Sequence, residues 1–125
     1  WYHTKDNHLD VIDDTLYYFD HFNGKILTYD EGMNLLNECE ITYPTKEDFW
    51  QHKIYKDKAL GKFYTIFGST VNEIDVNTGK TSAVANANQW MTEKIIIHKG
   101  NLYAVTKKRD SAGVWVSYVE RIVID

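Results

Sequence analysis

A unit of two strands joined by a tight turn recurs three times in this chain, and this repeat limits most strongly how the chain can fold. The clearest copy is the segment 61–80, GKFYTIFGSTVNEIDVNTGK. Its residues 63–67 are aromatic and β-branched, which are the types that fit a pleated sheet. Turn residues follow at 68–69, and Gly79 stands where a positive φ angle suits the end of the unit. Because both faces of the first strand are apolar, we expect it to be covered on both sides.

The two flanking copies keep the same order of elements. In each copy one strand has a bulky residue, a tyrosine, a variable residue and an apolar residue, at 16–19, 63–66 and 102–105. A short apolar strand precedes it, and a further strand that ends in an acid follows it. A period of roughly 40–50 residues with about four strands per unit is typical of propeller blades.

This period predicts an all-β fold of antiparallel four-stranded meander sheets in a propeller-like arrangement. We expect a single partial propeller unit over residues 1–125, with repeats at approximately 1–42, 43–87 and 88–125. Strands are expected at about 8–13, 15–20, 25–30, 34–42, 52–57, 62–67, 70–76, 80–86, 93–98, 101–107 and 113–119. The segment 121–125 is expected to begin a further strand, and 45–48 to form one helical turn.

Residues 62–64, KFY, followed by 71–80, VNEIDVNTGK, resemble the repeat of β-propellers of the six-bladed, NHL-like and YVTN-like kind. The resemblance covers most of the chain as about three blades, with departures from the turn motif at 31–34 and 121–123. Closed propellers have about 4–8 blades, so the resemblance implies a fragment of a longer chain or a homo-oligomer that completes a ring. The start at Trp1 instead of methionine agrees with a fragment. The motif is structural and does not select among the functions of such folds.

A closed up-and-down β-barrel that binds a small ligand is the alternative architecture. The number and length of the strands suit such a barrel, but its strands should be apolar on one side only. The doubly apolar strands and the tryptophan that precedes the first strand of each repeat favour blades instead.

The charge and the cysteine content exclude some partners and cross-links. The formal net charge is −4, and the short basic run at 107–109 is not the basic face that nucleic-acid binding requires. No segment approaches the roughly 18 apolar residues of a membrane span. Cys39 is the single cysteine, so an intrachain disulfide is excluded, and its acidic neighbours should raise its pKa. One cysteine suits a reducing compartment and a secreted propeller alike, and we expect an extracellular or periplasmic location over a cytoplasmic one.

The candidate binding residues are tryptophans and histidines near the start of each repeat. Trp1, Trp50 and Trp90 precede the first strands of the three repeats, where aromatic rings can stack on sugar rings or peptides. The competing interpretation is that each ring fills the seam between two blades. His3 and His52 follow two residues after the first two of these tryptophans, at positions that would point toward a central channel. The third repeat has no histidine there, so we predict no metal site.

Motifs of catalysis are missing from the sequence. It holds no nucleophile elbow, phosphate-binding loop or dinucleotide fingerprint, so we predict no catalytic residue and no cofactor. Trp115, which stands between two valines, is interpreted as core packing. We therefore expect a non-enzymatic binding or scaffold module whose blade-connecting loops contact protein or carbohydrate. The alternatives are a fragment of a propeller hydrolase or lyase that acts on carbohydrates, and a small-ligand-binding β-barrel.

Overall fold

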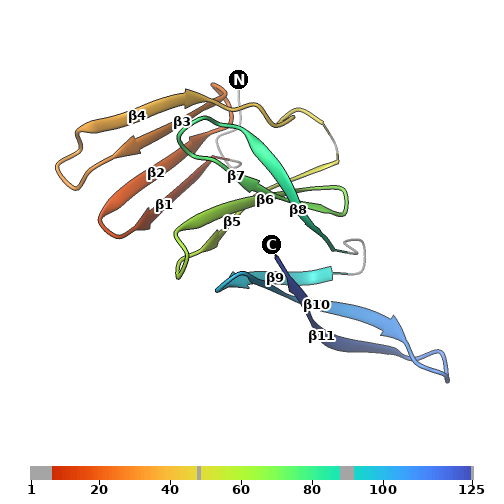
Figure 1. Cartoon of the computed structure of the whole chain (residues 1–125). Coiled ribbons are helices and arrows are strands. Elements are labelled where there is room, and N and C mark those ends of the chain that lie inside the picture. The colour runs from red at the N-terminus through yellow and green to blue at the C-terminus, as the bar shows by residue number, and fades with distance from the viewer. Residues whose placement is uncertain (1–6, 48, 88–91, 125) are drawn as a thin grey trace.

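The described part of the chain forms three antiparallel sheets stacked in chain order. The computed structural model describes residues 7–47, 49–87 and 92–124, and these residues contain no helix, so none of them could cross a membrane as a helix. Figure 1 shows sheet A (β1–β4) above, sheet B (β5–β8) in the middle and sheet C (β9–β11) below, where a long hairpin extends away from the stack. The described strands form separate sheets rather than a closed barrel, so the predicted all-β, propeller-like fold is confirmed.

Sheet A is a meander whose turns explain its register. Its strands pair in chain order and are β1 (His8–Ile12), β2 (Thr15–Asp20), β3 (Lys25–Tyr29) and β4 (Leu35–Glu40). Asp13 and Asp14 form the turn between β1 and β2 with φ angles of 48° and 66°. A type I′ hairpin turn requires positive φ at both of these positions, and aspartate tolerates it better than most residues.

Sheet B is a second four-stranded meander that contacts the end of sheet A. Its strands are β5 (Trp50–Asp57), β6 (Lys62–Phe67), β7 (Thr70–Ile74) and β8 (Thr81–Asn86). Thr42, just after β4, donates hydrogen bonds to the Gly79 carbonyl oxygen from its N–H at 3.1 Å and from its hydroxyl at 2.7 Å. A Cβ at Gly79 would overlap the carbonyl oxygen of Glu40, and φ is 75°, so only glycine fits this close approach.

Sheet C has three strands in the described residues. They are β9 (Thr92–His98), β10 (Asn101–Arg109) and β11 (Trp115–Val123). The pairing of β10 with β11 runs without a register shift from Arg109 opposite Trp115 to Asn101 opposite Val123. Residues 121–123 therefore continue β11, and the prediction that a further strand begins at 121 is wrong.

Two local predictions also differ from the structure. Trp115 is not packed in a core: it is 51% exposed near the tip of the β10–β11 hairpin, and the Arg109 guanidinium lies 4.9 Å from its ring centre. This hairpin extends beyond sheet B, so no neighbouring sheet covers its tip (Figure 1). The expected helical turn at 45–48 is a simple turn at 45–46, and residue 48 lies outside the described residues.

Sheet B lies between two hydrophobic cores. On one face, the ring centre of Phe63 is 5.0 Å from those of Tyr17 and Phe19 in sheet A. On the other face, Tyr64 belongs to a cluster with Leu102 of sheet C. Phe63 and Tyr64 are each 1% exposed, although they are neighbours in one strand. The prediction that β6 is covered on both sides is confirmed. Burial of each of these rings contributes about 1.5–3 kcal/mol to the stability of the fold.

Candidate functional site

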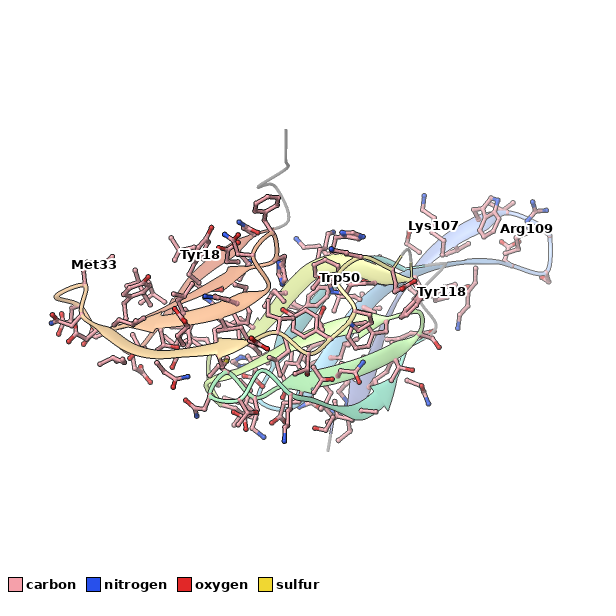
Figure 2. All side chains as sticks on the ribbon, turned by 90° about the horizontal axis from the view of Figure 1, so that it is seen from above. Tyr18, Met33, Trp50, Lys107, Arg109 and Tyr118 are labelled. Carbon is pink, nitrogen blue, oxygen red and sulfur yellow. The ribbon has the colours of Figure 1, made fainter. Side chains whose placement is uncertain are left out.

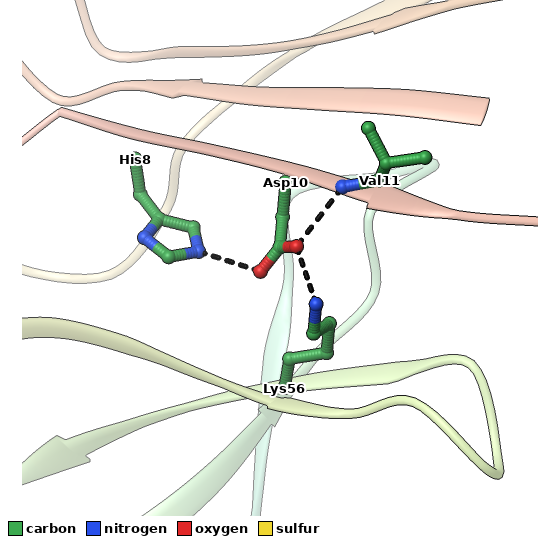
Figure 3. Close-up of polar contacts among 4 residues, drawn as sticks. All are labelled: His8, Asp10, Val11 and Lys56. Carbon is green, nitrogen blue, oxygen red and sulfur yellow. Dashed lines mark hydrogen bonds and ion pairs between the residues drawn. The ribbon is translucent and has the colours of Figure 1, made fainter. Parts of the chain in front are cut away.

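Polar side chains join the first strands of neighbouring sheets. Figure 3 shows Asp10 of β1 facing Lys56 of β5 across the seam between sheets A and B. Lys56 Nζ lies 2.6 Å from Asp10 Oδ1, which also accepts the Val11 N–H at 2.9 Å. His8 Nε2 lies 3.0 Å from Asp10 Oδ2. Both carboxylate oxygens of Asp10 therefore have protein partners. We call His8, Asp10 and Lys56 the Asp10 cluster.

The electrostatics of the Asp10 cluster keep its carboxylate charged at neutral pH. Partial burial raises the pKa of Asp10, but the hydrogen bonds from Lys56, His8 and the Val11 N–H outweigh this effect. The pKa of Asp10 consequently lies below its ordinary value of 3.8. Glycoside hydrolysis uses two carboxyl groups about 5–9 Å apart, whereas this cluster contains one carboxylate that is already engaged. Its evident role is to close the seam.

A second carboxylate, Asp57 at the end of β5, joins sheet B to sheet C. Its buried side chain accepts hydrogen bonds from the N–H groups of Lys99 at 3.0 Å and Gly100 at 2.7 Å, and from Leu60 in its own turn at 3.2 Å. Burial raises the pKa of Asp57, but these backbone hydrogen bonds lower it by more. No motif in the sequence singles out Asp57. The available signal is an acid at the end of a strand, which can accept backbone hydrogen bonds from turns.

The structure places Trp50 inside the seam between sheets A and B. Its ring is 2% exposed, and its indole N–H donates to Thr65 Oγ1 at 2.6 Å. The ring centre of His21 lies 4.6 Å away, and His21 Nε2 is 2.6 Å from the Tyr43 hydroxyl. Burial raises the pKa of Tyr43, so that hydroxyl stays protonated and serves as a hydrogen-bonding group. Trp50 therefore fills the seam between two sheets, which is the competing interpretation of the tryptophans, and its ring is buried from solvent.

His52 is the predicted binding residue that lies at the surface. It is exposed, with a φ of 58°, in the part of β5 where the register with β6 shifts between Trp50 and Ile54. The ring centres of His52 and Trp50 are 4.4 Å apart, so the structure brings these two predicted residues together. The other predicted residues, Trp1, His3 and Trp90, lie outside the described residues.

Each sheet carries an exposed aromatic residue at or beside the turn between its second and third strands. Phe22 lies in the turn between β2 and β3, Phe49 beside the turn between β6 and β7, and Trp115 follows the turn between β10 and β11; their exposed fractions are 53%, 51% and 51%. The Phe49 ring packs edge-to-face on Phe67 with centres 6.3 Å apart, and its carbonyl accepts the Gly68 N–H at 2.7 Å. We call Phe22, Phe49 and Trp115 the aromatic turns. The signal in the sequence is a large apolar residue within or next to a polar turn.

The surroundings of Cys39 keep its thiol protonated, which lowers its reactivity. Its thiol donates to the Val76 carbonyl at 3.3 Å, and burial, with a smaller effect from Asp75, raises its pKa. The predicted rise in the pKa of Cys39 is confirmed, but burial and not the acidic neighbours is its main cause. Among the residues that the structure describes, no group of three or more His, Cys, Asp or Glu side chains could hold a metal ion.

Comparison with known proteins adds no assignment to this geometry. No protein-family model matches the chain, and no curated protein matches it at a significant level. The sheets, the seam and the aromatic turns are therefore the features from which a function can be inferred.

Proposed function

We propose that this chain is a non-enzymatic binding or scaffold module of propeller-like blades that contacts protein or carbohydrate through loops at one end of its sheets. The observation that carries the proposal is the set of aromatic turns, because each sheet has a half-exposed ring at or beside the turn between its second and third strands. Exposed aromatic rings at or beside the same turn of every sheet are expected of a surface that the whole stack uses. The polar groups of the seams, in contrast, are engaged in joining the sheets.

Exposed aromatic rings favour ligands with apolar faces. Such rings leave water when a sugar ring or an apolar side chain packs on them, and aromatic residues are enriched in interfaces for this reason. Phe49 is held for such a contact by Phe67 and by the hydrogen bond to Gly68. A ring that is already fixed loses little conformational freedom on binding.

A fragment of a propeller enzyme that acts on carbohydrates is the second candidate, and the Asp10 cluster is the observation that favours it. Asp10 is a charged carboxylate on the first strand of its sheet, close to a histidine and a lysine. A catalytic role would require release of Asp10 from Lys56 and a second carboxylate about 5–9 Å away. The binding role requires neither change.

The test compares binding of the 125-residue chain and two variants to a glycan array and to a displayed peptide library. Phe49→Ser removes one aromatic turn. Met33→Ser is the matched control, because Met33 is 63% exposed at the turn between β3 and β4, far from β10 and β11 in Figure 2. We expect Phe49→Ser to weaken binding of the selected glycan or peptide by about tenfold, the effect of roughly 1.4 kcal/mol. The control should bind like the wild type.

Three results would count against this proposal. One is equal binding by Phe49→Ser and the wild type, and another is an absence of binding in both panels. The third is release of the chromophore from aryl glycosides by the wild-type chain with loss of that activity in Asp10→Asn, which would support the enzyme instead.

A further inference from the structure

Each sheet packs one particular face on the next sheet, and the repeat identifies this face. Tyr17 and Phe19 of sheet A lie against Phe63 of sheet B, with ring centres 5.0 Å apart in each pair. Tyr64 and Ile66 are their equivalents in sheet B, and these pack against sheet C. The contact is therefore directional. The face that bears the repeat tyrosine, the tyrosine face, covers the opposite face, the reverse face, of the following sheet.

One face of each type carries no sheet in the described structure. The tyrosine face of sheet C includes Tyr103 and, on the neighbouring strand, Val119, which is 75% exposed. The reverse face of sheet A includes Leu9, which is 61% exposed and stands in a cross-strand row with Tyr18 and Leu27. These are the two kinds of face that meet at the A–B and B–C contacts, so a contact between them would continue an interface already present.

The charges on the two uncovered faces are complementary. On the reverse face of sheet A, the cross-strand row that begins at Leu9 ends at Glu38, and Glu40 lies two residues further along β4 on the same face. Lys25 of β3 also lies on this face, and its Nζ is 3.4 Å from Glu38 Oε2. The tyrosine face of sheet C has exposed Lys94 and Arg121 in its cross-strand rows. An acidic face and a basic face attract one another and oppose like-with-like pairing.

We propose that the tyrosine face of sheet C packs on the reverse face of sheet A in a second copy of this chain. Contact between two unlike faces is heterologous, and it forms a closed ring when the rotation per unit permits. Closed propellers have about 4–8 blades, and two copies with three sheets each supply six. The dimer then has two identical contacts, which cover both apolar faces. This inference goes beyond the binding role, because it concerns how two copies pack through sheet faces and not how the aromatic turns contact a ligand.

The first test is the solution mass of the 125-residue chain by multi-angle light scattering. The expected mass is twice 14.6 kDa. Leu9→Lys places a positive charge on the reverse face of sheet A, opposite the basic face of sheet C, and Val119→Glu places a negative charge on the tyrosine face of sheet C, opposite the acidic face of sheet A. Both variants should be monomers with the circular dichroism of the wild type. Met33→Glu, at an equally exposed position outside both faces, is the control and should remain a dimer.

Mixing the two monomeric variants tests the direction of the contact. The mixture retains one intact pair of faces, the reverse face of Val119→Glu and the tyrosine face of Leu9→Lys, so a one-to-one dimer is expected. A wild-type monomer would overturn the proposal, as would a dimer that only one of the two variants disrupts, since that result indicates contact between like faces. A mixture that stays monomeric would also overturn it. A wild-type mass above two copies would overturn the closed dimer, because it indicates an open stack.

Discussion

Trp50 illustrates how one buried side chain joins two sheets without leaving a polar group unsatisfied. Its indole N–H donates to Thr65 Oγ1 at 2.6 Å, and the Thr65 hydroxyl donates in turn to the Lys53 carbonyl at 2.8 Å. A buried donor without a partner would cost about 1–3 kcal/mol. Because this donor is satisfied, the ring contributes its large apolar area to the seam.

Removal of the Trp50 ring should therefore destabilise the chain strongly. We expect Trp50→Ala to lower the free energy of unfolding by about 3–5 kcal/mol, the usual range for truncation of a large aromatic residue in a core. Urea denaturation followed by circular dichroism measures this loss. Trp115→Ala is the control and should change the free energy by less than about 1 kcal/mol, because that ring is half exposed. Equal losses in the two variants would contradict the assignment of Trp50 to the seam.

The Asp10 cluster makes the stability of the A–B seam depend on pH. The pKa of Asp10 in the folded chain lies below its ordinary value of 3.8. The unfolded state therefore binds more protons than the folded state in acid, and stability rises with pH in that range. The contribution of Asp10 is fully present above its unfolded-state pKa and is lost as the pH falls through the folded-state pKa.

Asp10→Asn should show this dependence in urea titrations at several pH values. We expect the free energy of unfolding at pH 7 to fall by about 1 kcal/mol, the upper end of the range for exposed ion pairs, because the side chains of Lys56 and Asp10 are only 30% and 17% exposed. The difference from the wild type should shrink as the solution becomes more acidic than the ordinary pKa of 3.8. Asp14→Asn, at the exposed turn between β1 and β2, is the control. A difference that grows on acidification would be the wrong sign for this account.

At the scale of the elements, local turn chemistry determines which strand bounds were predictable. The predicted bounds of β2 and β6 agree with the structure. β6 is enclosed by Gly61 and Gly68, which have φ angles of 66° and 56° and end the strand locally. The predicted strand at 113–119 ends too early, because β11 continues to Val123. Its end depends on continued pairing with β10 and not on the residues near 121.

The candidate site was less predictable than the strands. The repeat indicates which face of a strand is buried, but it does not say which side chains meet across a seam. Asp10 and Lys56 are 46 positions apart, and their contact follows from the relative placement of sheets A and B. Phe22 and Phe49 stand in loops, where a periodic pattern gives no information on exposure.

The turn between β7 and β8 allows a test at the scale of elements. Gly79 and Gly113 have similar φ angles of 75° and 79°, but a Cβ would overlap the Glu40 carbonyl at Gly79 and would meet nothing within 4 Å at Gly113. We expect Gly113→Ala to cost about 1–2 kcal/mol from the left-handed backbone alone. Gly79→Ala should cost more, because sheet B must also move away from the end of β4. Thermal and urea denaturation of both variants check this order, and equal losses would argue against the close approach.

At the scale of the whole molecule, sheet B is the layer on which the fold depends. It is the one described sheet with a hydrophobic core on each face, since the two clusters lie on its two sides. Sheets A and C each bury one face in these clusters, and their other faces carry exposed apolar residues. Stacked repeats of this kind gain stability from contacts with their neighbours, so the loss of sheet B would expose both remaining sheets.

The most direct test of this stack is a set of nuclear Overhauser effects across both faces of β6. The account predicts cross-peaks between the rings of Phe63 and Phe19, whose centres are 5.0 Å apart. It also predicts cross-peaks from the ring of Tyr64 to the methyl groups of Leu102, which share a core cluster. Cross-peaks from Phe63 and Tyr64 to one and the same sheet, or to neither sheet, would contradict it.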